Sequence, residues 1–295
     1  MDAKGESKET RFMREAPGDA QRRNVRFQMM DTSRMLDIGK HVYFGLAKRR
    51  SAYLTDKGLK LLNIKCTGLD LSTGNPSDGS DTFIRPFSVD RIREILAQTQ
   101  PDEDYDPPRP AFTFTRYNSA FHLVRWLLHY LEDSLYARAP IDHTEWQTRG
   151  VQWDDGENLE RCEQINGRGP DWKVMCILDK MDSVTSHVSC LLIEDAPLRD
   201  AQLCNSEIWC ILAITYRRMK LPEYRNHRII PVTVITTGFT RTRVVQGYID
   251  TQEGCVRARK SPIFDYEHDD PKQIIEILLS WCIGETVGDT KAQTS

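Results

Sequence analysis

Two apolar runs that lie close together constrain the fold of this chain more than any other feature. Residues 172–178 read WKVMCIL and residues 188–193 read VSCLLI. Short continuous apolar runs bounded by polar segments are typical of strands buried inside a sheet. The following segment, 200–219, carries apolar residues at helical spacing and predicts a long helix. The chain must therefore bury a sheet against helices.

Other periodic segments extend this pattern along the chain. The further predicted elements are helices over 88–98, 120–136 and 273–282 and strands over 145–153, 229–236, 243–250 and 255–259. Helices and strands alternate only in part, so we expect an α/β or α+β protein with a central mixed sheet flanked by helices.

A segment rich in proline and acid suggests how the chain is divided. Residues 100–110 read QPDEDYDPPRP, which fits neither a helix interior nor a central strand. We expect a surface linker there, between a small N-terminal helical or mixed region over 36–99 and a main domain over 111–285. The charged residues 1–35 are expected to form a disordered or loosely helical tail, and the last residues, 286–295, a disordered tail.

Composition excludes some classes of function. There are 40 Lys and Arg against 43 Asp and Glu, a net charge of -3, so no basic coat for nucleic acid covers the whole surface. No run of about 18 apolar residues exists, so no membrane span is expected. The first residues lack an apolar leader, and we expect an intracellular protein of the cytoplasm or nucleus.

Cysteine spacing gives no sign of a metal centre. The eight cysteines include no CxxC pair and no zinc-type cluster, and most lie in apolar runs. They are expected to be buried as small hydrophobic residues. Phosphate-binding loops, dinucleotide-binding glycine motifs and a GxSxG nucleophile elbow are also absent.

One pair of acids has a spacing that suggests chemistry. In PDWKVMCILDKMDSVTSHVSCLLIEDA, residues 170–196, Asp171 opens the first apolar strand and Glu194 closes the second. Acids at the ends of neighbouring strands can converge, and carboxylate oxygens suit a divalent cation. Mg²⁺ held there would activate a water molecule and stabilise charge on a phosphodiester.

This layout resembles the PD-(D/E)XK nuclease superfamily, which has the restriction-endonuclease-like fold, and is similar to a large group of uncharacterised fungal proteins with such domains. The resemblance covers about residues 118–250, where the predicted elements follow the αβββαβ order of that family's core. It implies that Asp171 and Glu194 are catalytic metal ligands for Mg²⁺. It also implies that Glu132, from the first helix, is an additional ligand.

The chain departs from the family pattern at the lysine. A lysine two residues after the second acid would share its strand face and stabilise developing charge, but that position is Ala196. Lys173, which would share a strand face with Asp171, is the nearest replacement as a catalytic residue. Arg199 and Gln202, at the start of the following helix, are weaker ones.

Three functions remain open on these residues. The first is a degenerate nuclease-like domain that binds nucleic acid and, if active, cleaves it with Mg²⁺. Its expected phosphate contacts are Arg22, Arg23, Arg26, Arg241, Arg243, Arg257, Arg259 and Lys260. The second is a non-enzymatic protein-interaction module with the same fold, and the third is an unrelated enzyme of a biosynthetic pathway. If the carboxylates of Asp171 and Glu194 converge, the first function is favoured. If they point apart or pair with other groups, the second function is favoured.

Overall fold

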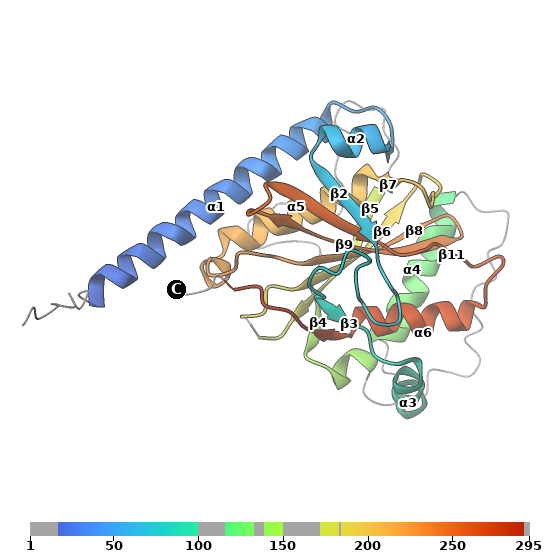
Figure 1. Cartoon of the computed structure of the whole chain (residues 1–295). Coiled ribbons are helices and arrows are strands. Elements are labelled where there is room, and N and C mark those ends of the chain that lie inside the picture. Colours follow the sequence, from blue (N-terminus) through green and yellow to red (C-terminus); the bar gives the residue numbers. More distant parts are fainter. Residues whose placement is uncertain (1–16, 100–115, 133–138, 150–171, 183, 292–295) are drawn as a thin grey trace, which may run out of the picture.

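A mixed eight-stranded sheet forms the centre of the molecule. The computed structural model describes residues 17–99, 116–132, 139–149, 172–182 and 184–291 (Figure 1). The strand order is β2-β10-β9-β8-β6-β5-β4, and β11 pairs with β9 beside this path. Its strands are β2 (Ile64–Gly68), β4 (Trp146–Arg149), β5 (Trp172–Lys180), β6 (Val188–Glu194), β8 (Val232–Gly238), β9 (Arg241–Asp250), β10 (Cys255–Lys260) and β11 (Phe264–Asp265).

The pairing of these strands confirms the expected mixed sheet. Strand β6 runs parallel to β8, and β2 runs parallel to β10. The other neighbours on the path are antiparallel. Strand β6 is buried along its whole length. That burial explains why its sequence is continuously apolar rather than alternating.

Helices cover both faces of the sheet (Figure 1). On one face α1 (Pro17–Ala47) packs on α5 (Asn205–Lys220), and on the other α3 (Val89–Thr99) and α4 (Arg116–Glu132) pack on α6 (Pro271–Cys282). Successive side chains of a strand point to opposite faces. Cys190 and Leu192 of β6 therefore join the α1/α5 layer, while Leu191 and Ile193 join the α4/α6 layer.

Short elements complete the description. These are β1 (Tyr53–Leu54), which pairs with β7 (Leu203–Cys204), β3 (Ile84–Arg85), which pairs with β12 (Glu285–Thr286), the helix α2 (Asp56–Leu61), and the 3-10 turns Pro140–His143 and Pro222–Tyr224. The helix predicted over 200–219 begins only at Asn205, because Leu203 and Cys204 pair with β1 as strand β7.

The N-terminal region differs from the separate unit that the sequence suggests. Strand β2 lies in the main sheet, with Ile64 opposite Val256 of β10. Met35, Val42 and Leu46 of α1 are buried in the same layer as α5. Residues 36–99 thus share their core with the main domain, because pairing between distant segments has no local sequence signal. The predicted linker, 100–110, lies outside the described residues.

Both predicted tails are shorter than the sequence suggests. Helix α1 already begins at Pro17, so residues 17–35 are helical. At the other end, residues 286–291 are hydrogen-bonded to the body of the protein, including Val287 N to Phe83 O at 2.9 Å. Local composition is polar in both segments, whereas Met35 of α1 and residues 287–290 contact remote parts of the chain. Among the described residues, no helix is both long and apolar enough to cross a bilayer.

Candidate functional site

The two strand ends that carry the predicted acids lie side by side. Trp172, the first residue of β5, is paired with Glu194, the last residue of β6. Asp171 itself lies outside the described residues. The pairing therefore agrees with the expected neighbourhood of the two strand ends.

Glu194 has a buried and hydrogen-bonded carboxyl group. The residue is 1% exposed. Its Oε1 accepts a hydrogen bond from the Ala196 amide at 3.1 Å, and its Oε2 accepts one from the Ser206 hydroxyl on α5. Burial raises the pKa of Glu194 to about 7, although these two hydrogen bonds act in the opposite direction. The carboxyl group therefore points into the α5 layer.

Lys173 lies on the other face of the sheet. It is paired with Ile193, whose side chain is in the α4/α6 layer. Its neighbours Trp172 and Val174 pack into the opposite, α1/α5 layer. Paired residues of an antiparallel ladder share a face. The structure therefore does not bring the amine of Lys173 to the carboxyl of Glu194.

Glu132 is the last residue of α4 and is exposed. Helix α4 covers the face of the sheet away from Glu194, and Glu132 adds to burial in raising the pKa of Cys176 in that layer. Of the predicted metal ligands that the structure describes, Glu132 and Glu194 thus belong to opposite layers.

Ala196 lies at a buried position that neighbouring backbone encloses. The residue is buried, and its amide is bonded to Glu194. Its carbonyl oxygen lies 2.8 Å from the point where a Cβ on Gly238 would stand. Only glycine fits at 238 without moving this backbone, so the loop after β6 is packed against the end of β8.

Arg199 and Gln202 contact each other and the local loop. Arg199 Nη1 donates to Gln202 Oε1 at 3.2 Å, and the Arg199 guanidinium lies over the Tyr53 ring at 4.0 Å. Tyr53 in turn donates to the Pro197 carbonyl at 2.7 Å. These contacts hold β1 against the loop that follows Glu194.

A buried ion pair beside Glu194 was not predicted as such. Arg243 donates to both carboxylate oxygens of Glu207, at 2.7 and 2.6 Å, and neither side chain is exposed. Its Nη1 also donates to the carbonyls of Arg199 and Gln202, at 2.9 and 2.8 Å. Burial acts to lower the pKa of Arg243, but the Glu207 carboxylate outweighs it and raises the pKa. Arg243 was expected to contact phosphate; it instead fixes the start of α5.

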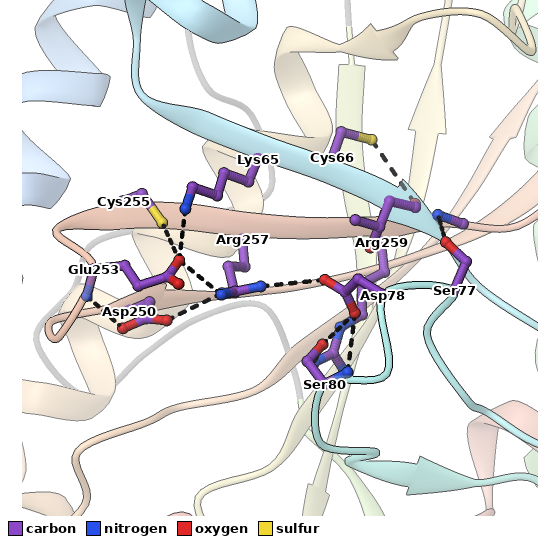
Figure 2. Close-up of polar contacts among 12 residues, drawn as sticks. Lys65, Cys66, Ser77, Asp78, Ser80, Asp250, Glu253, Cys255, Arg257 and Arg259 are labelled. Atoms are coloured by element: carbon purple, nitrogen blue, oxygen red, sulfur yellow. Dashed lines mark hydrogen bonds and ion pairs between the residues drawn. The ribbon is translucent and has the colours of Figure 1, made fainter.

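The predicted basic strip on β10 is neutralised within the protein (Figure 2). Arg257 binds the carboxylates of Asp250, Asp78 and Glu253, at 3.0, 3.1 and 2.7 Å. Lys65 of β2 also pairs with Glu253, at 2.8 Å. The guanidinium of Arg257 therefore already carries three carboxylate partners.

Arg259 is the buried member of this strip. It is 1% exposed and donates to Gln246 Oε1 at 2.9 Å and to Ser80 Oγ at 3.0 Å. Its guanidinium lies 4.9 Å from the Phe83 ring centroid and 5.3 Å from that of Tyr248. The alternation predicted that Arg257 and Arg259 share a face, but that face is covered by the segment carrying Ser80 and Phe83.

The other predicted phosphate contacts of this region also have internal partners. Arg241 pairs with Asp265 at 2.9 Å, and Lys260 Nζ donates to the Asp200 carbonyl. The side chains of Arg22, Arg23 and Arg26 lie outside the described part of the structure. Within that part, the arginines expected to form a phosphate-binding surface serve mainly to bind loops to the sheet.

A group of possible metal ligands lies at the turn after β11. One ligand atom from each of Asp265, Glu267 and His268 falls within 4.8 Å of the others. Asp265 is already paired with Arg241 and with His268, at 2.9 and 3.5 Å, and accepts from the Glu267 amide. These contacts account for the cluster as a turn closed by Asp265, so it offers no preference for Mg²⁺.

The described cysteines confirm the expectation of buried small hydrophobic residues. They are free thiols, and all but the half-buried Cys66 are buried: Cys176, Cys190, Cys204, Cys210, Cys255 and Cys282. Burial raises the pKa of Cys204 and Cys282, for example, which keeps both protonated and unreactive.

The chain matches no protein-family model, no curated protein and no solved structure.

Proposed function

We propose that this chain is a degenerate PD-(D/E)XK-like module that does not cleave phosphodiesters and acts as a non-enzymatic protein-interaction module. One observation carries the proposal. The carboxyl of Glu194 is buried against Ser206 and Ala196, on the opposite face of the sheet from Lys173. The residue at the second acid position of the motif, Glu194, thus contributes to the packing of the protein interior.

The order of elements supports the family part of the proposal. Helix α4, strands β4, β5 and β6, helix α5 and strand β8 follow each other along the described chain. Strands β4, β5 and β6 are successively antiparallel, and β8 returns parallel to β6. Apart from the short β7 between β6 and α5, this order agrees with the αβββαβ pattern that the resemblance implies, which supports the proposal.

The chemistry at Glu194 supports the loss of cleavage. A carboxyl group binds a divalent cation best when it is ionised and its oxygens are accessible. Both oxygens of Glu194 already accept hydrogen bonds, and a pKa of about 7 leaves the group about half protonated at neutral pH. The lysine position is the buried Ala196. Among the described residues, Glu194 is therefore not a ready metal ligand, and no lysine stands at position 196.

Surface composition favours a protein partner over nucleic acid. The arginines of β9 and β10 have internal partners.

In contrast, a chain of aromatic rings runs from the start of β5 over α5 to α1. Trp172, Trp209, Tyr43 and Phe44 have successive centroid distances of 5.7, 5.3 and 5.4 Å. Phe44 is 59% exposed and the other three are half-buried. Aromatic residues are enriched in protein interfaces.

Calorimetric titration tests the proposal. Mg²⁺ and Mn²⁺ are titrated into the protein and into an Asp171→Ala, Glu194→Ala double variant, with a cleavage assay on single- and double-stranded DNA and RNA. We expect the two proteins to give the same heats of titration, so that the substitutions abolish no metal binding. We also expect no metal-dependent cleavage. If the unchanged protein binds metal and cleaves nucleic acid, and the double variant does neither, the chain is an active nuclease and the proposal is wrong.

A further inference from the structure

The last described residues form a strap on the body of the protein. After α6, β12 pairs with β3, and the amide of Val287 donates to the Phe83 carbonyl at 2.9 Å. Farther on, the Thr290 carbonyl accepts from the amides of Arg228 and Ile229, at 2.9 and 3.3 Å. We call residues 285–291 the C-terminal strap.

His187 holds the middle of the C-terminal strap. It directly precedes β6, is 4% exposed, and its Nε2 lies 3.0 Å from the Val287 carbonyl oxygen. A carbonyl only accepts, so Nε2 must carry the hydrogen. Neutral His187 then has a bare Nδ1, and this atom is buried with no hydrogen-bond partner in the described structure. A proton added at Nδ1 would be a buried donor without an acceptor.

His227 holds the end of the C-terminal strap. It is 8% exposed, and its Nδ1 lies 2.8 Å from Thr290 Oγ1. Its backbone forms an isolated antiparallel bridge with Lys291, and its ring also interacts with the backbone of Val184. Two histidines from the body thus contact the strap within four residues of each other along the chain.

We propose that the C-terminal strap is an acid-released latch, in which protonation of His187 and His227 detaches residues 287–291 from the body. The neutral imidazoles hold the strap at neutral pH. The bound strap disfavours the charged form of both buried rings, whereas the detached strap lets them take up protons and be hydrated.

The charged groups around the two rings act mainly against protonation in the bound state. Lys180 and His227 face His187 and disfavour its charged form, while Asp182 favours it. Lys291 and Arg218 disfavour protonation of His227, and Asp289 favours it. Asp182 also accepts from the Val184 and Thr185 amides of its own turn. Burial is the largest cause, and it lowers the pKa of His187 to about 4 and also lowers that of His227.

The sign of the effect follows from these directions. A histidine whose pKa is lower in the bound state than its usual 6.5 stabilises that state above pH 6.5, and the stabilisation is lost as pH falls toward 4. For His187 alone, the equilibrium for strap binding is expected to fall by about 20-fold between pH 7 and pH 5. The latch is at the opposite end of β6 from Glu194, so it is independent of the proposed function.

Hydrogen exchange measured by NMR at pH 7, 6 and 5, corrected for intrinsic rates, tests the latch. The amide protons of Val287 and Arg228 report strap binding, and those of β8 report global stability. We expect protection at the two strap amides to fall by about 20-fold over this range. Protection in β8 should not fall in parallel, because the buried Glu194 carboxyl makes the fold more stable as the pH decreases.

His187→Gln is the critical variant, because its side-chain amide donates to the Val287 carbonyl and does not titrate near neutral pH. It should lose most of the pH dependence at the strap amides. His268→Gln, at a histidine side chain that is 74% exposed, should behave like the unchanged protein. Equal pH dependence in His187→Gln, or none in the unchanged protein, would overturn the proposal.

A second measurement does not depend on any variant. The ring signals of His187 and His227 are titrated by NMR in the unchanged protein, alongside the Val287 amide exchange. We expect the loss of strap protection to follow the protonation of the two rings. Rings that titrate while the Val287 amide stays protected would also overturn the latch.

Discussion

At the scale of single residues, burial decides what a charged side chain does. Glu194 and Arg243 have the residue types expected of a nuclease site, yet both are satisfied by neighbours within the protein. Both have partners on α5, Ser206 and Glu207, which are adjacent in the sequence. The start of α5 therefore uses the side chains that would otherwise be available to a metal or a phosphate.

Replacement of Glu194 by Gln should change the pH dependence of stability. The pKa of Glu194 is raised from 4.5 to about 7, so its contribution is most favourable below pH 4.5 and is lost as pH rises through 7. Relative to the unchanged protein, Glu194→Gln should gain up to about 3 kcal/mol between pH 4.5 and pH 8. Urea unfolding at both values measures this difference. A variant whose free energy of unfolding runs parallel to that of the unchanged protein would contradict it.

Removal of one partner of the buried ion pair should be strongly destabilising. Arg243→Met leaves the Glu207 carboxylate buried without its cation, and we expect a loss of about 3–5 kcal/mol. The double variant Arg243→Met, Glu207→Leu removes both charges and should recover much of that loss. Chemical denaturation of the three proteins checks this. Equal losses in the single and double variants would mean that the pair is not the source of the effect.

At the scale of elements, α1 is a part of the core. Its buried residues Met35, Val42 and Leu46 lie in the same layer as residues of α5, β8 and β9. A helix with a low overall hydropathy can still be fixed by one buried stripe. In the part of α1 whose side chains are described, the polar residues Arg34, Asp37 and Lys40 are exposed.

A matched pair of leucine variants tests the packing of α1. Leu46 is 3% exposed and Leu61, on α2, is 69% exposed. Leu46→Ala should lower the free energy of unfolding by about 2–5 kcal/mol, whereas Leu61→Ala should change it by less than about 0.5 kcal/mol. Urea denaturation followed by circular dichroism gives both values. Similar effects of the two substitutions would show that α1 does not contribute to the core.

At the scale of the whole molecule, the sheet joins the two ends of the chain. Strand β2 pairs with β10, α1 covers α5, and β12 pairs with β3. Each of these contacts links the first hundred residues to the last hundred. The described residues therefore have their cores on the two faces of one sheet.

Unfolding should therefore be a single cooperative transition. Scanning calorimetry at neutral pH should give one peak whose calorimetric and van't Hoff enthalpies agree. Leu46→Ala in the N-terminal region and Leu178→Ala in β5 should both move that same peak to lower temperature. Two resolved peaks, with each variant moving only one of them, would indicate that residues 36–99 unfold separately.

The sequence by itself determined the class of fold and the main helices and strands between residues 116 and 282. Apolar runs located β5 and β6, helical spacing located α4 and α6, and β-branched residues located β8, β9 and β10. These patterns are local, since the period of a helix or a strand is written in consecutive residues. The position of Glu194 at the end of β6, beside the start of β5, also followed from them.

Only the tertiary structure decided which side chains meet. The face of the sheet that receives Lys173 depends on its register with Ile193, and the partner of Arg243 is Glu207, which is 36 residues away. The incorporation of β2 and the C-terminal strap depends on contacts across almost the whole chain. Such contacts form because a remote segment offers complementary apolar area, hydrogen bonds or charge, and a short stretch of sequence does not contain that information.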